Sequence, residues 1–168
     1  RMVSNTAHYF PKRIDKNAKY YGISFINKPE YTLKYIALSN LNKSCCVLCT
    51  QGTKTAKIYN QTNHDGLEIL YPSDKQCEEV QSIIYQIKDT ANVDYIKTAL
   101  KLARLMEKIG DYTFILACTE LSILDKSLLG QASIVDAMDI LSMMLVNKSG
   151  YRIKMVDNRY DEKIIRTM

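Results

Sequence analysis

Cys118 is the side chain of this sequence best placed for acid–base chemistry, because it ends the apolar run FILAC and leads into Thr119 and Glu120. A thiol at such a turn can ionise near neutral pH when a helix start and free backbone N–H groups stabilise the thiolate. The same position also suits an inert buried cysteine, so position alone leaves both interpretations open. A second polar turn, residues 4–6, begins with Ser4, whose hydroxyl does not ionise at neutral pH unless a base activates it.

The rest of the sequence predicts the elements that position these residues. Apolar runs of strand length alternate with segments whose apolar residues recur at helical spacing. This alternation is typical of βαβ units, and it predicts an α/β fold with a parallel sheet. We expect strands over residues 21–27, 45–50, 67–72, 112–118 and 132–135, and helices over residues 29–39, 77–87, 96–109 and 136–147.

Three of the expected strand ends run into turns rich in Thr, Asn and Ser. These turns are residues 4–6, 50–53 and 118–120. In open α/β sheets, ligands bind at the carboxyl ends of the strands. Helix amino termini at that edge offer free N–H groups and a positive dipole end, which favour anions. The turns therefore predict a site suited to carboxylate groups.

Composition excludes several classes of protein. The 168 residues carry a net charge of +5 without a clustered basic stripe, so we expect no nucleic-acid partner. No apolar run is long enough to predict a membrane span, and we expect no signal peptide. The five cysteines are odd in number and irregular in spacing, which favours reduced thiols in a cytoplasmic protein. We interpret CCVLC as a buried strand and expect no metal site, because zinc would need four ligands.

Four motifs together resemble the aspartate/glutamate racemase family. They are SNTAH (residues 4–8), CTQGT (49–53) with Tyr59 after it, IIYQ (83–86) and ILACTEL (115–121). Family members show Cys-Asn-Thr-Ala-His, Thr-x-Gly-Thr, Ile-Ile-Tyr-Glu and Gly-Cys-Thr-Glu-Leu in the same order. Each motif alone is weak, but four in order, in a strand-turn-helix context, are a strong signal. The resemblance covers roughly residues 1 to 147.

The resemblance implies a racemase that acts on aspartate or glutamate without a cofactor. In the family, one cysteine takes the α-proton and a second returns a proton to the opposite face. It implies a catalytic pair at Cys118 and Ser4, a small acidic amino acid as partner, and a possible homodimer. Lys88 lies near the place of a family lysine that contacts the distal carboxylate. The implied substrate-binding residues are Asn5, Thr6, Thr50, Thr53, Thr119, Glu120 and Lys88.

The sequence also departs from the family pattern. Ser4 stands where the first catalytic cysteine is expected, which breaks the two-thiol mechanism on one face. Gln51 replaces a usual glutamate, Ser122 a usual proline, and Leu141 falls where a histidine is common. We therefore expect an impaired or one-sided enzyme, an inactive relative, or an engineered serine that traps substrate. The alternative function is a non-catalytic module that binds an acidic amino acid or a dicarboxylate.

The resemblance further predicts how the chain divides. We expect one complete α/β lobe of the racemase type over residues 25–130, which carries Cys118. Residues 1–24 and 131–168 are expected to form an incomplete first lobe. Because family members have more chain before this point, we expect a truncated protein, or one whose missing strands come from another chain.

Overall fold

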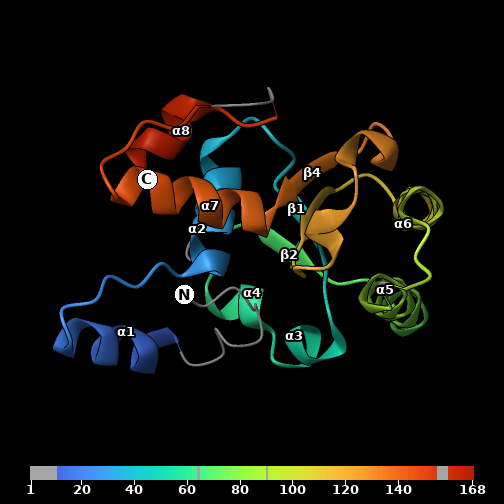
Figure 1. Ribbon diagram of the computed structural model, residues 1–168, viewed down its shortest axis with the longest axis horizontal. Coiled ribbons are helices and arrows are strands. Elements are labelled where there is room, and N and C mark those ends of the chain that lie inside the picture. Colours follow the sequence, from blue (N-terminus) through green and yellow to red (C-terminus); the bar gives the residue numbers. More distant parts are fainter. Residues whose placement is uncertain (1–10, 64, 90, 155–158) are drawn as a thin grey trace.

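One parallel sheet of four strands forms the centre of the computed structural model, which describes residues 11–63, 65–89, 91–154 and 159–168 (Figure 1). The strand order is β2-β1-β3-β4, and each neighbouring pair is parallel. The strands are β1 (Ser44–Leu48), β2 (Glu68–Leu70), β3 (Thr113–Leu116) and β4 (Ser133–Asp136). The predicted α/β fold with a parallel sheet is confirmed.

Helices cover both faces of this sheet (Figure 1). On one face lie α2 (Lys28–Leu38), α7 (Ala137–Lys148) and α8 (Glu162–Thr167). On the other lie α5 (Asp74–Lys88) and α6 (Tyr95–Ile109). The shorter helical elements are α1 (Pro11–Tyr20), α3 (Gln51–Thr55), α4 (Ile58–Gln61), η2 (Leu121–Ile123) and η3 (Lys126–Leu129).

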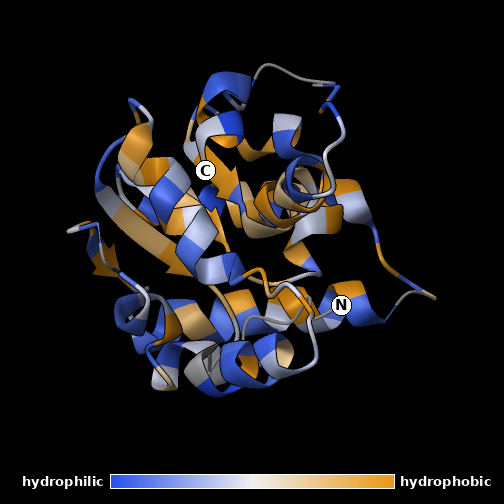
Figure 2. Ribbon diagram, turned by 90° about the vertical axis from the view of Figure 1, so that its left-hand side faces the viewer, coloured by the Kyte–Doolittle hydropathy of each residue, from blue (hydrophilic) through white to orange (hydrophobic). Residues whose placement is uncertain are grey.

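The strands are apolar on both sides because each face packs on its own helical layer. Successive residues of a strand point to opposite faces, so Cys45 packs with α2 and α7 while Cys46 packs with α5 and α6. In the same way Ile115 and Leu116 of β3 join opposite cores. Figure 2 shows this concentration of hydrophobic residues in the strands. The prediction that CCVLC forms a buried strand is confirmed, and its cysteines are free thiols.

Local signals set the bounds of the long helices. Ser73 and Gln76 form a capping box at the start of α5. Asp94 accepts a hydrogen bond from the backbone N–H of Lys97 (2.9 Å) at the start of α6, which ends before Gly110. The four long helices expected from the sequence are therefore confirmed, with bounds shifted by a few residues.

The strand expected over residues 21–27 is wrong. Gly22 adopts a left-handed conformation (φ +67°), and its N–H donates to the carbonyl of Lys19. The N–H of Ile23 donates to the carbonyl of Ala18 (2.8 Å). These two bonds form a Schellman motif that closes the carboxyl end of α1. The segment therefore terminates a helix, and none of its residues pairs with a described strand.

Replacing Ile115 with alanine is expected to lower the free energy of unfolding by about 2–5 kcal/mol. Ile115 is fully buried in β3 between the two neighbouring strands and under α2 and α7, so the deletion leaves a cavity. Urea unfolding measures the change. Ile96→Ala is the matched control, because Ile96 is 64% exposed on α6 and should change stability by less than about 0.5 kcal/mol. Equal losses in both variants would contradict this packing.

Candidate functional site

The carboxyl ends of β1 and β3 lie side by side at one edge of the sheet. Leu48 pairs with Leu116, and the N–H of Ala117 donates to the carbonyl of Leu48 (2.9 Å). Thr50 comes two residues after Leu48, and Cys118 comes two residues after Leu116. The parallel register therefore brings two of the three polar turns predicted from the sequence to the same edge.

Glu120 is the centre of a compact cluster at this edge. Its Oε2 accepts hydrogen bonds from the Cys118 thiol (2.8 Å) and from the Thr119 hydroxyl (2.9 Å). Its Oε1 lies 3.5 Å from the Nζ of Lys88, at the carboxyl end of α5. Four of the residues predicted for the site are thus linked by direct contacts, namely Cys118, Thr119, Glu120 and Lys88. Lys88 is nevertheless 30 residues from Cys118 in the chain.

The cluster keeps Cys118 as a thiol. Burial raises the pKa of Cys118 to about 12, and the hydrogen bond to Glu120 and the charge of that carboxylate add to the effect. Burial alone would raise the pKa of Glu120 as well, but hydrogen bonds from Cys118, its own backbone and Thr119 hold that pKa below its usual value. At neutral pH the pair is therefore a thiol that donates and a carboxylate that accepts, so a thiolate is not the resting form.

Thr50 and Thr53 are positioned by the turn that starts α3. Their hydroxyl oxygens lie 3.3 Å apart, and Thr53 is buried. Thr50 is the N-cap residue of α3, and its side chain makes no capping hydrogen bond. Its hydroxyl accordingly keeps hydrogen-bonding capacity for a ligand at the edge of the sheet.

The remaining predicted site residues are Ser4, Asn5 and Thr6. They lie outside the residues that the structure describes, so their predicted roles stay predictions. The same holds for the opposite side of the site that Ser4 is expected to form.

A second cluster at this edge, centred on Asp136, was missed by the reasoning from sequence. Asp136 ends β4, is fully buried and lies 2.8 Å from the Nζ of Lys126. The Ser122 hydroxyl donates to its Oδ1 (2.7 Å), and Lys126 also donates to the carbonyl of Ser122 (2.6 Å). These contacts tie the loop that follows Cys118 to the end of β4. The sequence signal that could have indicated this cluster was an aspartate at the junction of an apolar strand and a helix.

Lys28 is the other missed residue. It is fully buried at the start of α2, and its Nζ lies 3.6 Å from the Sδ of Met138. Burial lowers the pKa of Lys28 to about 8, while the negative charges of Asp136 and of an ionised Cys118 act to raise it. A lysine beside Pro29 at a helix start gave no indication of this burial.

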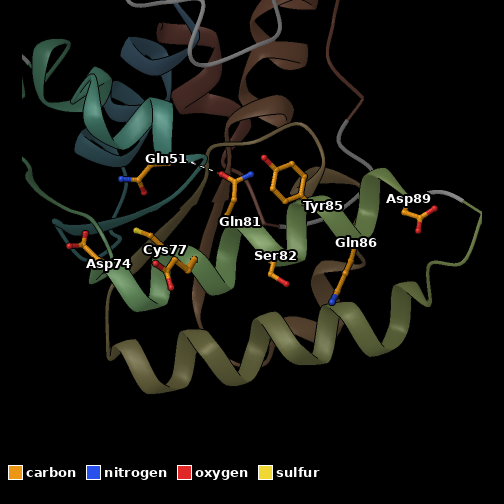
Figure 3. Close-up of a pocket in the computed structure, with 9 residues that line it drawn as sticks. Gln51, Asp74, Cys77, Gln81, Ser82, Tyr85, Gln86 and Asp89 are labelled. Atoms are coloured by element: carbon orange, nitrogen blue, oxygen red, sulfur yellow. Dashed lines mark hydrogen bonds between the residues drawn. The ribbon is translucent and has the colours of Figure 1, made fainter.

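A groove of about 820 Å³ runs along α5 (Figure 3). Gln51 at the start of α3 contributes one wall, and its backbone N–H donates to Oε1 of Gln81 (3.2 Å). Tyr85, Gln86 and Asp89 continue the groove toward the end of α5. Its lining does not include Cys118 or its hydrogen-bonding partners, so it adjoins the candidate site without forming it.

Within residues 11–63, 65–89, 91–154 and 159–168, no three His, Cys, Asp or Glu side chains are grouped to hold a metal ion. The helices of this same part of the chain are all too short or too polar to cross a bilayer.

Comparison with known proteins gives two findings. The model of the family described as Asp/Glu/Hydantoin racemase matches residues 2–145. Among solved structures, the fold is similar to that of Picrophilus torridus aspartate racemase, with 18% sequence identity and a TM-score of 0.68. That match covers 98% of this chain but 65% of the racemase chain. The structural likeness shows a shared fold, and this chain spans less than two thirds of the longer protein.

Replacing Glu120 with glutamine is expected to make Cys118 more reactive. The substitution removes the negative charge that favours the thiol, so the pKa of Cys118 should fall and the thiolate fraction at pH 8 should rise about tenfold. Iodoacetamide labelling followed by mass spectrometry measures this in the tryptic peptide 109–126, in which Cys118 is the single cysteine. Glu107→Gln, on an exposed part of α6, is the matched control. An unchanged or slower rate in Glu120→Gln would contradict the described cluster.

Proposed function

The chain belongs to the Asp/Glu/Hydantoin racemase family, and from this we propose that it binds an acidic amino acid and exchanges the α-proton at Cys118 without a cofactor. The observation that carries the proposal is the contact of Cys118, Thr119 and Lys88 with Glu120 at the carboxyl edge of the sheet. A thiol, a hydroxyl and an ammonium group converge there. These groups are suited to proton transfer and to the recognition of carboxylates.

A different protein group would serve each face of the substrate α-carbon. On one face of the α-carbon, the Cys118 thiol is already protonated and can donate its proton to a carbanion. To remove an α-proton from that face, Cys118 must first lose its own proton, which its pKa of about 12 makes rare in the free protein. On the opposite face we propose Ser4, a weak base. The proposed enzyme is therefore slow and one-sided.

Lys88 and the threonine hydroxyls would bind the substrate. Lys88 is half-exposed beside Glu120, so its ammonium group can reach a carboxylate from solvent. Thr50 can donate a hydrogen bond to a second carboxylate. Thr119, on the adjacent strand end, can do the same when its hydroxyl turns away from Glu120. The proposed substrate is aspartate or glutamate, because both carry two carboxylates. The homodimer, the cytoplasmic location and the division into lobes at residues 25–130 stay predictions.

A second candidate function is binding of an acidic ligand without turnover. Two observations favour it, namely Ser4 in place of a cysteine and the hydrogen bond that keeps Cys118 protonated. Such a module would retain the contacts to carboxylates and lose the proton exchange. Calorimetry with L- and D-aspartate and glutamate separates the two candidates, since a heat of binding without α-proton exchange supports the module.

Incubation in heavy water is expected to introduce deuterium at the α-carbon of one enantiomer of aspartate or glutamate faster than of the other. The reason is that Cys118 serves one face and Ser4 the opposite one. Proton NMR and mass spectrometry follow the exchange. Cys118→Ala should abolish it, whereas Cys46→Ala, which removes a thiol inside β1, should retain it in the folded protein. Equal exchange of both enantiomers by Cys118→Ala would overturn the assignment.

Ser4→Cys is expected to restore the second thiol and to make the exchange less one-sided. A cysteine ionises far more readily than a serine near neutral pH, so the slow face should gain at least about tenfold in rate. The same heavy-water assay measures the ratio for the two enantiomers. Ser4→Ala is the matched control and should gain nothing. If Ser4→Cys and Ser4→Ala behave alike, Ser4 does not serve the second face.

A further inference from the structure

Cys77, near the start of α5, has an ammonium group in direct contact with its sulfur. The Nζ of Lys54, on α3, lies 3.3 Å from the Cys77 Sγ. The same ammonium group donates to the carbonyl of Pro72 (2.9 Å) and to Oδ1 of Asp74 (2.9 Å). An ammonium group has three N–H donors, so these acceptors use all of them and fix its position. The thiol and the cation thus form a defined pair between two helices.

Cys77 also forms part of the wall of the groove along α5 (Figure 3). Gln51 and Gln81 lie beside it in the same wall. Cys77 is 5% exposed, whereas Cys45 and Cys46 inside β1 are at most 1% exposed. A small molecule that enters the groove can therefore reach the sulfur of Cys77.

The charges that face Cys77 favour its ionised form on balance. The hydrogen bond to Asp74 raises the pKa of Lys54, so the ammonium group stays charged at neutral pH. Asp74 and Glu78, on α5, act in the opposite sense, but both are exposed and water screens their charges. The side chain of Lys54 is only 20% exposed and touches the sulfur. From β1 and its end come only neutral thiols, because burial raises each pKa in residues 45–49 to about 11 or higher.

Cys77 differs in this respect from the thiol of the candidate site. Cys118 donates a hydrogen bond to the carboxylate of Glu120, and a negative neighbour favours the neutral thiol. Cys77 accepts a hydrogen bond from a cation, and a positive neighbour favours the thiolate. The thiolate is the form of cysteine that reacts with oxidants. The two thiols are therefore divided by their neighbours into an acid and a nucleophile.

We propose that Cys77 is the site at which hydrogen peroxide oxidises this chain, with the ammonium group of Lys54 as its activating partner. The thiolate sulfur attacks one peroxide oxygen, so that an S–O bond forms and the O–O bond breaks. The sulfur is oxidised to a sulfenic acid and the peroxide is reduced. The departing oxygen takes a proton from Lys54 and leaves as water, and Lys54 regains from solvent the proton that the thiol released. This reaction does not depend on the proposed activity at Cys118.

The surroundings of Cys77 also fit the product of this reaction. The thiol donates a hydrogen bond to the carbonyl of Pro72 (3.2 Å) and accepts one from Lys54. A sulfenic acid keeps one O–H donor and gains an oxygen that accepts, so it can hold both partners. The groove beside the sulfur supplies room for the added oxygen. The modified side chain would thus keep the contact between α3 and α5.

Treatment of the purified full chain with hydrogen peroxide and excess dimedone, which traps sulfenic acids, tests the proposal. Trypsin separates the thiols into peptides 44–54, 76–88 and 109–126, and Cys77 is the single cysteine of peptide 76–88. Mass spectrometry should find the adduct first in peptide 76–88. Lys54→Met should slow its formation about tenfold, because the positive charge that favours the thiolate is lost. Lys54→Arg should retain most of the rate, and Lys57→Met, which removes an exposed lysine nearby, should retain all of it.

A merely loosened fold gives the opposite result in Lys54→Met, because greater exposure of Cys77 would speed its oxidation. An equal or faster rate in Lys54→Met would overturn the proposal. If that variant does not fold, the natural chain still decides, since an adduct that forms first in peptide 44–54 or 109–126 would also overturn it. The assay needs no amino acid. Oxidation at Cys77 without any α-proton exchange would therefore support this site and reject the racemase function.

Discussion

The parallel register of β1, β3 and β4 is the constraint on which the candidate site depends. It sets Leu48, Leu116 and Asp136 in one row across the sheet. The turns that follow these three strands therefore emerge at one edge of the sheet, where helix starts and loops supply polar groups. A shift of one residue in either pairing would turn Cys118 from one core toward the other and separate it from Lys88. The candidate site is thus a consequence of strand pairing between segments that are far apart in the sequence.

Two electrostatic clusters share this edge, one centred on Glu120 and one on Asp136. The Glu120 carboxylate accepts the proton of Cys118 in a hydrogen bond and favours the neutral thiol. At the end of β4, the Asp136 carboxylate lies beside the ammonium group of Lys126 and accepts a hydrogen bond from the Ser122 hydroxyl, which ties the loop after Cys118 to the sheet. Family enzymes with two cysteines divide acid and base roles between two residues. Here burial and the contact with Glu120 set how readily Cys118 gives up its proton.

Local patterns were sufficient to predict most elements and part of the site. The apolar run at residues 45–50 and the periodicity of residues 77–87 act over short distances, and both predictions hold. The strand over residues 21–27 failed because Gly22 closes a helix, and an apolar run does not distinguish a strand from a helix end. Contact between Lys28 and Met138 joins residues 110 positions apart, so no local pattern could show it. Burial of a charge depends on such tertiary partners, which explains why the Asp136 cluster was missed.

Adjacent cysteines of β1 belong to different helical layers, since Cys45 faces α2 and α7 while Cys46 faces α5 and α6. Burial raises the pKa of Cys45 to about 11 and that of Cys46 to about 12. Neither thiol can meet a reagent until its own layer opens. A single strand therefore holds two independent probes of local unfolding, and hydrogen–deuterium exchange in the two layers can be compared with thiol labelling residue by residue. Cys45 and Cys46 thus report separately on the opening of the two helical layers.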